Sequence, residues 1–440
     1  MDLDTAQLDR ACGVLLAAAA GNALGAGHEA GASPQSIPVQ RSGGRIDGTL
    51  RMLAVAEVAA SGADLRAASA HEVIRARWAN RGKGVGGPLV WTVPVALAYL
   101  DDPGGLTEAA TAISALTHDT PEAGEACVLW CHAIRHAVLT GFLDARAGLK
   151  RLPEPARARW ADRLRSAERA RTRDFAAAEA LQAAWCAITT TEVPLDEPVT
   201  GTFRVDHLRL ALEDAARGGR ETAAIAGGLL GAAYGASAVP ARWRLELSDR
   251  PDPRSPDPVA LAAAIATGGT YARPVYGGGD RPAVAVPHPD DPGVVLGDLD
   301  AVRDLPEGVT AVVSLCPVGE TERRAILAGT RHWIEVRLAD RDEPEENPNL
   351  DFVLHDTVTA VERLRASGHV VLVHCVGAYS RTPTIGALYA MRRTGADPDQ
   401  AIAAIELALP EADPTDAFRD ALRRGRPDHG PRPRRPDTVG

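Results

Sequence analysis

A cysteine and an arginine near the C-terminal end of the chain have the types and spacing for chemistry on an anion. An aliphatic run from Val370 to Val373 leads into His374 and Cys375. Arg381 follows six positions after the cysteine and opens a segment with apolar residues at helical spacing. A loop between a strand and a helix points backbone N–H groups at one place, where the positive end of the helix favours an anion. The pattern therefore predicts a nucleophilic thiolate at the floor of a phosphate-binding loop.

The segment from about residue 290 to about residue 395, which includes this loop, resembles the dual-specificity protein phosphatase family. The resemblance implies that Cys375 attacks phosphorus and that Arg381 grips the phosphoryl oxygens. It further implies that Thr382 eases departure of the thiolate and that His374 orients the loop. An activated thiol and a planar guanidinium are also the groups that phosphoryl transfer favours. The residues that would bind the phosphate along with Arg381 are Val376, Gly377, Ala378, Tyr379 and Ser380.

The loop departs from the family at one position. The family usually has glycine at the third position after the cysteine, whereas here Gly377 is second and Ala378 is third. Glycine accepts backbone angles that other residues avoid, so we expect this loop to follow a slightly different path.

The ester oxygen that leaves phosphorus needs a proton, and in this family an aspartate on an upstream loop supplies it. Residues 332 to 340 have the pattern of a strand that runs into such a loop. Asp340 matches the family's position best. Asp342 is the alternative, because the loop extends through Leu350 and is a few residues longer than usual.

Length and composition set the broad class. With 440 residues, the chain is long enough for two or three domains, each with its own core. The net charge of −10 argues against broad nucleic-acid binding, because phosphate contacts need a basic surface. The chain opens with an acidic rather than an apolar segment, and its six cysteines are scattered. These features predict a reducing, cytoplasmic location.

The chain divides into regions of different composition. Residues 1–248 are rich in alanine and predict an all-α domain, whereas strand-like runs appear only later and predict an α/β domain over 271–425 with a central sheet flanked by helices. A segment dense in Pro, Asp and Arg predicts a linker over 249–270, and the basic end, 426–440, is expected to be a disordered tail. The uncharged stretch from Thr222 to Ala241 is mostly Ala and Gly, which favours a tightly packed buried helix over a membrane span.

Five short blocks across the helical region resemble, in order, the ADP-ribosylglycohydrolase family. The resemblance implies an all-α fold whose cleft binds ADP-ribose. It also implies a pair of magnesium ions held by carboxylates and a threonine, and an acid near the first glycine-rich turn. The blocks are Arg10 to Glu29, Gly43 to Thr49, Gly82 to Pro94, Leu116 to His118 and Thr222 to Trp243.

This chain lacks several of the residues with which the family holds the magnesium pair. Where the family has Thr-Asp-Asp-Thr, this chain has Ile46 to Thr49, with only Asp47 and Thr49 retained as candidate ligands. The second motif, at residues 218 to 222, lacks its aspartates and carries Arg220 instead. Because a magnesium pair needs several hard oxygen ligands, we predict weak or no metal binding by this half.

Two residues remain as candidate contacts to ADP-ribose. Glu29 matches a glutamate of the family, and Asn22 stands where the family has an acid. Either residue, like Asp47 and Thr49, is also compatible with an ordinary turn or cap role.

Three functions are compatible with these motifs. The first is a phosphomonoester hydrolase of protein phosphatase type, which forms a phosphoenzyme on Cys375, needs no cofactor and uses the helical half for recognition or regulation. The second is an active ADP-ribosylglycohydrolase that removes ADP-ribose from proteins, with the phosphatase as a second activity. The third is a non-catalytic protein that binds ADP-ribose or phosphorylated ligands.

The nearly complete loop after Cys375 favours the first function. Its expected partner is a phosphorylated protein or a small phosphoester, with no nucleic-acid or membrane partner. The sequence leaves open whether the phosphate is carried by tyrosine, by serine or threonine, or by a small molecule.

Overall fold

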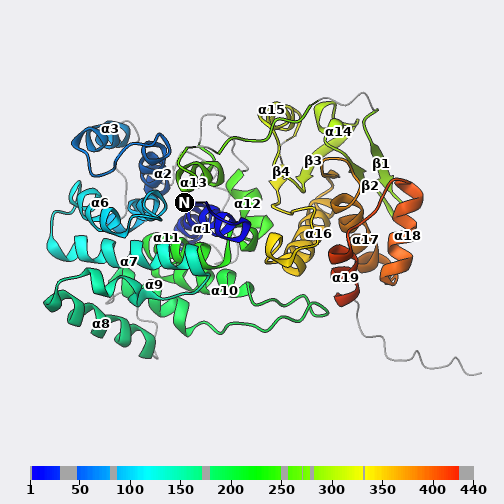
Figure 1. Ribbon diagram of the computed structural model, residues 1–440. Coiled ribbons are helices and arrows are strands. Elements are labelled where there is room, and N and C mark those ends of the chain that lie inside the picture. The colour runs from blue at the N-terminus through cyan, green and yellow to red at the C-terminus, as the bar shows by residue number, and fades with distance from the viewer. Residues whose placement is uncertain are drawn as a thin grey trace, which may run out of the picture.

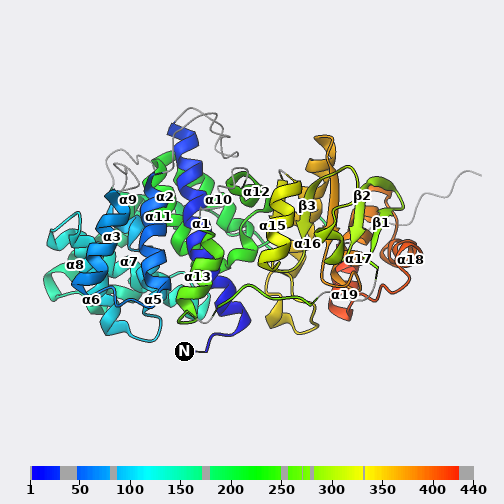
Figure 2. The same cartoon turned by 90° about the horizontal axis from the view of Figure 1, so that it is seen from above.

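A computed structural model describes residues 2–29, 47–79, 87–170, 179–248, 256–269, 271–277, 282–330 and 332–425. The chain forms a helical half and an α/β half that lie side by side (Figures 1 and 2). This arrangement agrees with the predicted all-α region followed by an α/β region. The predicted tail over 426–440 and the first part of the predicted linker, 249–255, lie outside the described residues.

The helical half is built from helices, with a long connection between residues 190 and 206. Its elements are α1 (Thr5–Glu29), α2 (Asp47–Ala60), α3 (Ala68–Ala79), α4 (Pro88–Trp91), α5 (Val93–Ala98), α6 (Pro103–Ala115), α7 (Pro121–Thr140), η1 (Ala145–Arg151), α8 (Glu154–Arg169), α9 (Ala180–Thr190), α10 (Asp206–Ala215), η2 (Ala216–Gly218), α11 (Arg220–Tyr234), η3 (Ala236–Ala238), α12 (Ala241–Ser248) and α13 (Pro258–Ala266).

Helices α1 and α11 form the centre of this half. A Cβ atom on Gly231 would lie 2.1 Å from the carbonyl oxygen of Gly13, and one on Gly227 would lie 2.2 Å from that of Ala17. Only glycine permits so close an approach of two helix backbones. The expectation of a buried, small-residue helix after Thr222 is therefore confirmed, since α11 is buried along nearly its whole length.

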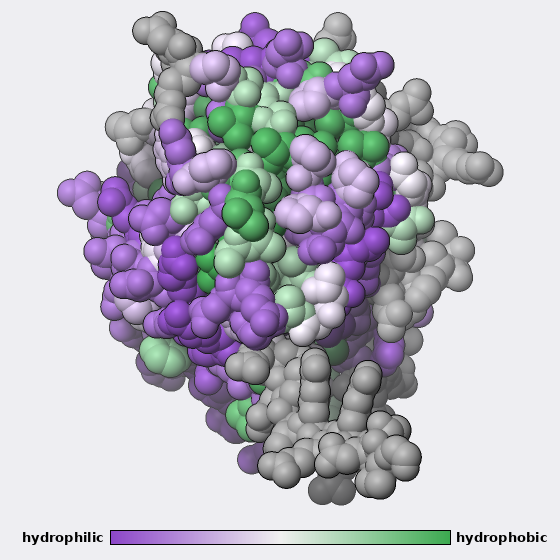
Figure 3. Space-filling model, turned by 90° about the vertical axis from the view of Figure 1, so that its right-hand side faces the viewer, coloured by the Kyte–Doolittle hydropathy of each residue, from purple (hydrophilic) through white to green (hydrophobic). Residues whose placement is uncertain are grey.

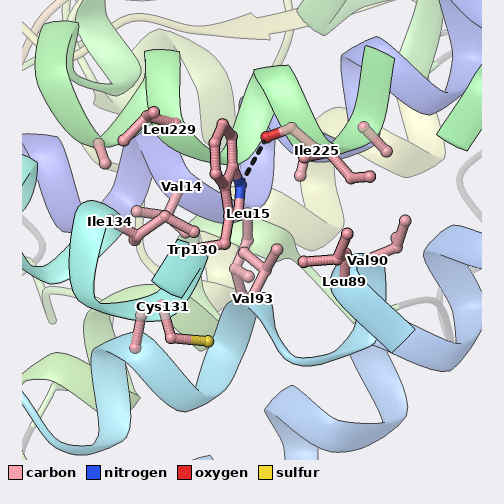
Figure 4. Packing of buried hydrophobic residues seen from close by; sticks show 14 of the residues in the cluster. Val14, Leu15, Leu89, Val90, Val93, Trp130, Cys131, Ile134, Ile225 and Leu229 are labelled. Atoms are coloured by element: carbon pink, nitrogen blue, oxygen red, sulfur yellow. Dashed lines mark hydrogen bonds between the residues drawn. The ribbon is translucent and has the colours of Figure 1, made fainter. Parts of the chain in front are cut away.

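Larger side chains from several helices fill the space around this pair. Trp130 of α7 is 1% exposed and donates its indole N–H to the carbonyl oxygen of Ile225 at 3.1 Å (Figure 4). The hydrogen bond satisfies the polar end of a large apolar side chain in the core. Aliphatic residues of α1, α4, α5 and α11 pack around the ring (Figure 4).

The structure corrects the predicted linker at one point. Residues 258–266, within the expected linker 249–270, form α13, whose Ala262, Ala263 and Ile265 are buried in the core of the helical half. Asp257 caps this helix by accepting the N–H groups of residues 259 and 260, and Pro258 occupies its first turn. Proline and aspartate are common in linkers, but they are also strong helix-start residues.

The α/β half contains a five-stranded sheet. Its elements are β1 (Ala285–His288), β2 (Asp291–Gly297), α14 (Asp300–Arg303), β3 (Val309–Ser314), α15 (Glu320–Gly329), β4 (His332–Glu335), η4 (Pro344–Glu346), α16 (Leu350–Ala366), β5 (Val370–His374), α17 (Arg381–Thr394), α18 (Pro398–Ala408) and α19 (Asp416–Arg424).

The strands lie in the order β1-β2-β5-β3-β4, and all are parallel except β1. Strand β5 is central, and its side chains alternate between the faces of the sheet. Val371 and Val373 pack on the side covered by α16, α17 and α18, whereas Leu372 packs on the side of α14 and α15. Burial on both faces explains the continuous aliphatic run that leads to the cysteine.

One end of the α/β half shows how polar and apolar residues divide on its surface. Hydrophilic residues cover much of this face, and hydrophobic residues gather in its upper part (Figure 3). Within the described part of the chain, one helix, α1, is long and apolar enough to cross a membrane, and 94% of that stretch is buried inside the protein. Core helices of globular proteins share this length and composition.

Candidate active site

The predicted nucleophile lies where the sequence places it, between the carboxyl end of β5 and the start of α17. Cys375 is 1% exposed, whereas Val376 and Tyr379 of the following loop are 39% and 40% exposed. Ser380 is the N-cap of α17, a 14-residue helix. The thiol thus lies at the base of a loop that leads into the positive end of a helix.

Ala378 adopts a left-handed backbone conformation with φ of 59°, the one such non-glycine residue in the described part of the chain. This is the third position after the cysteine, where the resemblance leads one to expect glycine. The loop therefore follows the backbone path that usually requires glycine, and alanine holds it at a cost of about 1–2 kcal/mol. That the loop follows a different path from the family's stays a prediction.

His374 is held by a relay of hydrogen bonds beneath the loop. Its Nδ1 lies 3.2 Å from the carbonyl oxygen of Cys375, and its Nε2 lies 2.7 Å from Oγ of Ser314. Trp333 donates its indole N–H to the same Oγ at 3.0 Å. Burial lowers the pKa of His374 to about 4, so the ring is neutral near pH 7. Since a carbonyl oxygen can only accept, Nδ1 carries the proton and Ser314 donates to Nε2.

The guanidinium of Arg381 is anchored on one edge. Its Nη1 donates to the carbonyl oxygens of Leu315 and Leu338, at 3.3 and 3.1 Å. Among the described residues, the buried Nε has no hydrogen-bond partner. The Nε edge of a guanidinium offers two parallel N–H groups, which is the fork that fits two phosphoryl oxygens.

Asp340 faces this free edge. Its Oδ2 lies 3.6 Å from Nε of Arg381, and its buried Oδ1 has no hydrogen-bond partner within the described residues. Asp342, the alternative acid, instead accepts the N–H of Ala417 at 3.0 Å, at the start of α19. The structure thus brings Asp340 and not Asp342 to Arg381.

Thr382 lies in the first turn of α17 and is fully buried. Its hydroxyl donates to the carbonyl oxygen of Gly297, at the end of β2, at 3.2 Å. This bond ties the helix start to the sheet.

A second thiol, Cys316, lies beside the site just after β3. It is 1% exposed, and burial raises its pKa to about 12, against the lowering effect of Arg381. A thiol in this state is protonated at neutral pH and is a poor nucleophile.

The sequence analysis did not identify Ser314 and Trp333, which position His374. Ser314 pairs with His374 across β3 and β5. The sequence offered one signal, a serine at the end of a largely aliphatic strand. Its partner on the neighbouring strand depends on how the two strands pair, which the sequence does not give.

In the helical half, one of the residues expected to contact ADP-ribose, Glu29, forms an ion pair. Arg220 lies 2.6 Å from Oε2 of Glu29, and its backbone N–H donates to Oε1 of the same carboxylate at 2.9 Å. Although burial acts in the opposite direction, the hydrogen bonds from Arg220 lower the pKa of Glu29. This carboxylate is therefore ionised and already neutralised by an arginine.

The other candidates of this half are less engaged. Asn22 is 1% exposed, and its Oδ1 has no partner among the described residues; the same holds for the buried Oγ1 of Thr49. The side chain of Asp47 lies outside the described residues. Across the ranges that the structure describes, no group of three or more His, Cys, Asp or Glu residues could hold a metal. The residues present do not fit a pair of magnesium ions, since an arginine occupies the second motif.

Comparisons with known proteins match each half separately. The family model for ADP-ribosylglycohydrolase matches residues 3–271. Among solved structures, an ADP-ribosylglycohydrolase-related protein complex is 24% identical, with a TM-score of 0.41, and the match covers 60% of this chain and 99% of that one. Human DUSP28 is 23% identical, with a TM-score of 0.26, and the match covers 33% of this chain and 95% of that one.

A human tyrosine phosphatase-like serine/threonine/tyrosine-interacting protein is 21% identical, with a TM-score of 0.24, and the match covers 30% of this chain and 89% of that one. Comparison with curated proteins finds no match. The family model, in contrast, spans well over half of the sequence, through residue 271 of 440. The chain therefore belongs to the ADP-ribosylglycohydrolase family.

Proposed function

We propose that the α/β half is a cysteine-dependent phosphomonoester hydrolase that acts on a phosphorylated protein or a small phosphoester. The observation that carries this proposal is the convergence of a thiol, a half-anchored guanidinium and an aspartate at the carboxyl end of the central strands. Cys375 follows β5, and Asp340 lies 3.6 Å from Arg381. In a parallel sheet flanked by helices, this edge is where ligands bind.

The proposed reaction has two steps. The thiolate of Cys375 attacks phosphorus while the ester oxygen leaves and takes a proton from Asp340. Water then attacks the phosphocysteine, Asp340 accepts its proton, and inorganic phosphate and the thiolate are released. In both steps the free edge of Arg381 and the loop N–H groups bind the equatorial oxygens of the phosphoryl group. These contacts stabilise the negative charge on those oxygens in the transition state.

Unpaired buried atoms at the site support this assignment. Nε of Arg381 and Oδ1 of Asp340 are buried and lack a hydrogen-bond partner among the described residues. Buried polar atoms without partners are costly, and a substrate with oxygens on one side and a leaving group on the other would satisfy both.

The loop also bears on the class of substrate. Val376, Gly377, Ala378 and Tyr379 place no basic side chain beside the thiol. A ligand with several phosphates would need additional positive charge, so a single phosphate on a protein or small molecule fits this site better.

For the helical half we propose a role in recognition or regulation without a magnesium pair and with little or no release of ADP-ribose. The ion pair between Glu29 and Arg220 supports this, because the guanidinium supplies the positive charge that a cation would otherwise bring. Titration calorimetry of the full chain with magnesium should give no micromolar binding. Micromolar binding, or robust release of ADP-ribose from a modified protein, would instead favour an active glycohydrolase.

The phosphatase proposal is tested with a substrate panel on the full chain. The panel contains phosphotyrosine and phosphothreonine peptides, a phosphoinositide, phosphorylated ADP-ribose and an aryl phosphate. We expect hydrolysis of at least one member, a phosphocysteine trapped by acid quenching, and loss of both in Cys375→Ser. Cys186→Ser, a buried thiol of α9, is the matched control and should retain activity. Equal activity of Cys375→Ser and the parent protein would disprove the proposal.

A further inference from the structure

The loop that carries Asp340 is attached to the helical half at several points. It runs from the end of β4 to the start of α16, and both elements lie on the side of the α/β half that faces α1 and α12 (Figure 1). The contacts described below join the loop to the helical half on one side and to the candidate active site on the other.

The end of the loop is held by Asn349. Its side-chain amide donates to the carbonyl oxygen of Tyr234, at the end of α11, and to Oγ of Ser237, both at 2.8 Å. Ser237 in turn donates its hydroxyl to the buried carboxylate of Asp9 in α1 at 2.6 Å. Both amide hydrogens of Asn349 are therefore used on the helical half.

The start of the loop is held by charged groups. Nε of Arg337 lies 3.7 Å from Oδ1 of the same Asp9, and its Nη1 donates to Sγ of Cys12 at 3.5 Å. At the end of β4, two residues before Arg337, the carbonyl oxygen of Glu335 accepts from Nη1 of Arg244 in α12 at 2.9 Å. Asp9 thus receives interactions from both ends of the loop, through Arg337 directly and through Ser237.

Within the loop, Asn347 connects these anchors to Asp340. Its Oδ1 accepts the N–H of Ala339 at 2.8 Å, and its Nδ2 donates to the carbonyl oxygen of Ala339 at 2.9 Å. This two-point contact fixes the peptide groups on both sides of the residue before Asp340. On the other side, the carbonyl oxygen of Leu338 accepts from Arg381.

A cavity of about 150 Å³ lies between the loop and the helical half, lined by Asp9, Ser237, Arg337, Asn347 and Asn349 among others. The lining also includes apolar residues such as Leu338, Leu350 and Val353, so the loop is held by polar and apolar contacts together. Removing a polar anchor should release the loop without collapsing a core.

We propose that the helical half positions the acid-bearing loop of the phosphatase half. In this inference, which rests on the proposed function, Asn349 and Arg337 hold the loop against α1 and the end of α11, and Asn347 transmits that position to Asp340. These three residues are positioning residues, since they do not touch the reacting atoms. The helical half thereby serves the chemistry of the other half although its own metal ligands are depleted.

The test compares Asn349→Ala with Gln7→Ala in the full chain. Gln7 is the matched control, because its amide donates to the carbonyl oxygen of Leu139 inside the helical half and has no link to the loop. By hydrogen–deuterium exchange, peptides covering residues 338–349 should exchange about tenfold faster in Asn349→Ala, and at the parent rate in Gln7→Ala. Unchanged exchange in Asn349→Ala would overturn the inference.

A kinetic readout separates positioning from general destabilisation. Asn349→Ala should lower kcat about tenfold for a substrate with a poor leaving group, with KM and the turnover of an activated aryl phosphate nearly unchanged, because only the poor leaving group needs the proton of Asp340. Equal loss on both substrates would contradict the proposal. If the parent chain hydrolyses no phosphoester, the proposed function fails, while the exchange experiment still decides whether the loop is held by the helical half.

Discussion

At the level of single residues, the loop after Cys375 contains one position whose backbone conformation opposes its side chain. Ala378 has a φ of 59°. For a non-glycine residue this conformation costs about 1–2 kcal/mol, whereas glycine adopts it freely but loses about 0.5–1 kcal/mol through the greater freedom of the unfolded chain. The difference between these two costs favours glycine at position 378.

Ala378→Gly should therefore raise the free energy of unfolding by about 0.5–1 kcal/mol, as measured by denaturant titration. The same substitution in an ordinary helical position is the control. Ala403→Gly, at an exposed position within α18, should lower the free energy of unfolding by about 1 kcal/mol. Destabilisation of similar size in both variants would show that the left-handed conformation carries no strain.

His374 makes stability depend on pH. Burial lowers its pKa from 6.5 to about 4, so the folded protein keeps the ring neutral while the unfolded chain protonates it. Between pH 6.5 and 4 the unfolded state binds more protons, and the free energy of unfolding falls as the pH is lowered.

His374→Asn should flatten this slope by up to about 1.4 kcal/mol per pH unit in that window, as followed by urea titrations at several pH values. Thr384→Val, which removes a buried hydroxyl of α17 and no titrating group, should keep the parent slope. If both variants show the parent slope, the ring of His374 is not the buried neutral group described above.

At the level of elements, the loop between β4 and α16 separates the roles of two nearby aspartates. Asp340 faces Arg381, whereas Asp342 accepts the N–H of Ala417 at the start of α19. One carboxylate therefore lies beside the arginine of the candidate active site, and the other lies at the start of a helix.

Asp340→Asn should lower the turnover of substrates with poor leaving groups by about a hundredfold or more, with little change in their binding. Asp342→Asn is the matched variant and should leave turnover unchanged. It should lower stability by at most about 1 kcal/mol, the usual effect of a weakened cap. Steady-state kinetics on a phosphopeptide distinguishes the two, and equal activity of Asp340→Asn and the parent would remove Asp340 from the role.

At the level of the whole molecule, the two halves share a polar interface in addition to the loop contacts. Arg244 of α12 is 8% exposed and donates to the carbonyl oxygens of Val239 and Glu335, at 3.0 and 2.9 Å. The N–H of Ala241 donates to Asp356 of α16 at 2.7 Å. Hydrogen bonds of this kind are costly to break when one partner stays buried, so the halves should unfold together.

Calorimetry of the parent chain should show a single cooperative transition. Arg244→Met should split this transition into two, with one half unfolding at a lower temperature. The reason is that the carbonyl oxygen of Glu335, across the interface, loses a charged donor, at about 1.5–3 kcal/mol. Arg324→Met, which removes a largely exposed partner of Glu320, should leave the transition almost unchanged. Two separate transitions in the parent protein would show that the interface does not couple the halves.

The sequence alone determined the features that depend on neighbours along the chain. The aliphatic run before Cys375, the spacing to Arg381 and the helical periodicity beyond it predict the strand, loop and helix that the structure contains. The change from alanine-rich helices to β-branched strands likewise predicts the two halves, because secondary structure follows local periodicity.

Contacts between distant segments were decided only by the tertiary structure. The proximity of Asp340 to Arg381 is of this kind. So are the pairing of Arg220 with Glu29 across 191 positions and the hydrogen bonds of Asn349 to the helical half. So is α13, whose first residues resemble a linker until its apolar face meets α1. Local patterns state which groups are available, but only the folded chain brings them within hydrogen-bonding distance of one another.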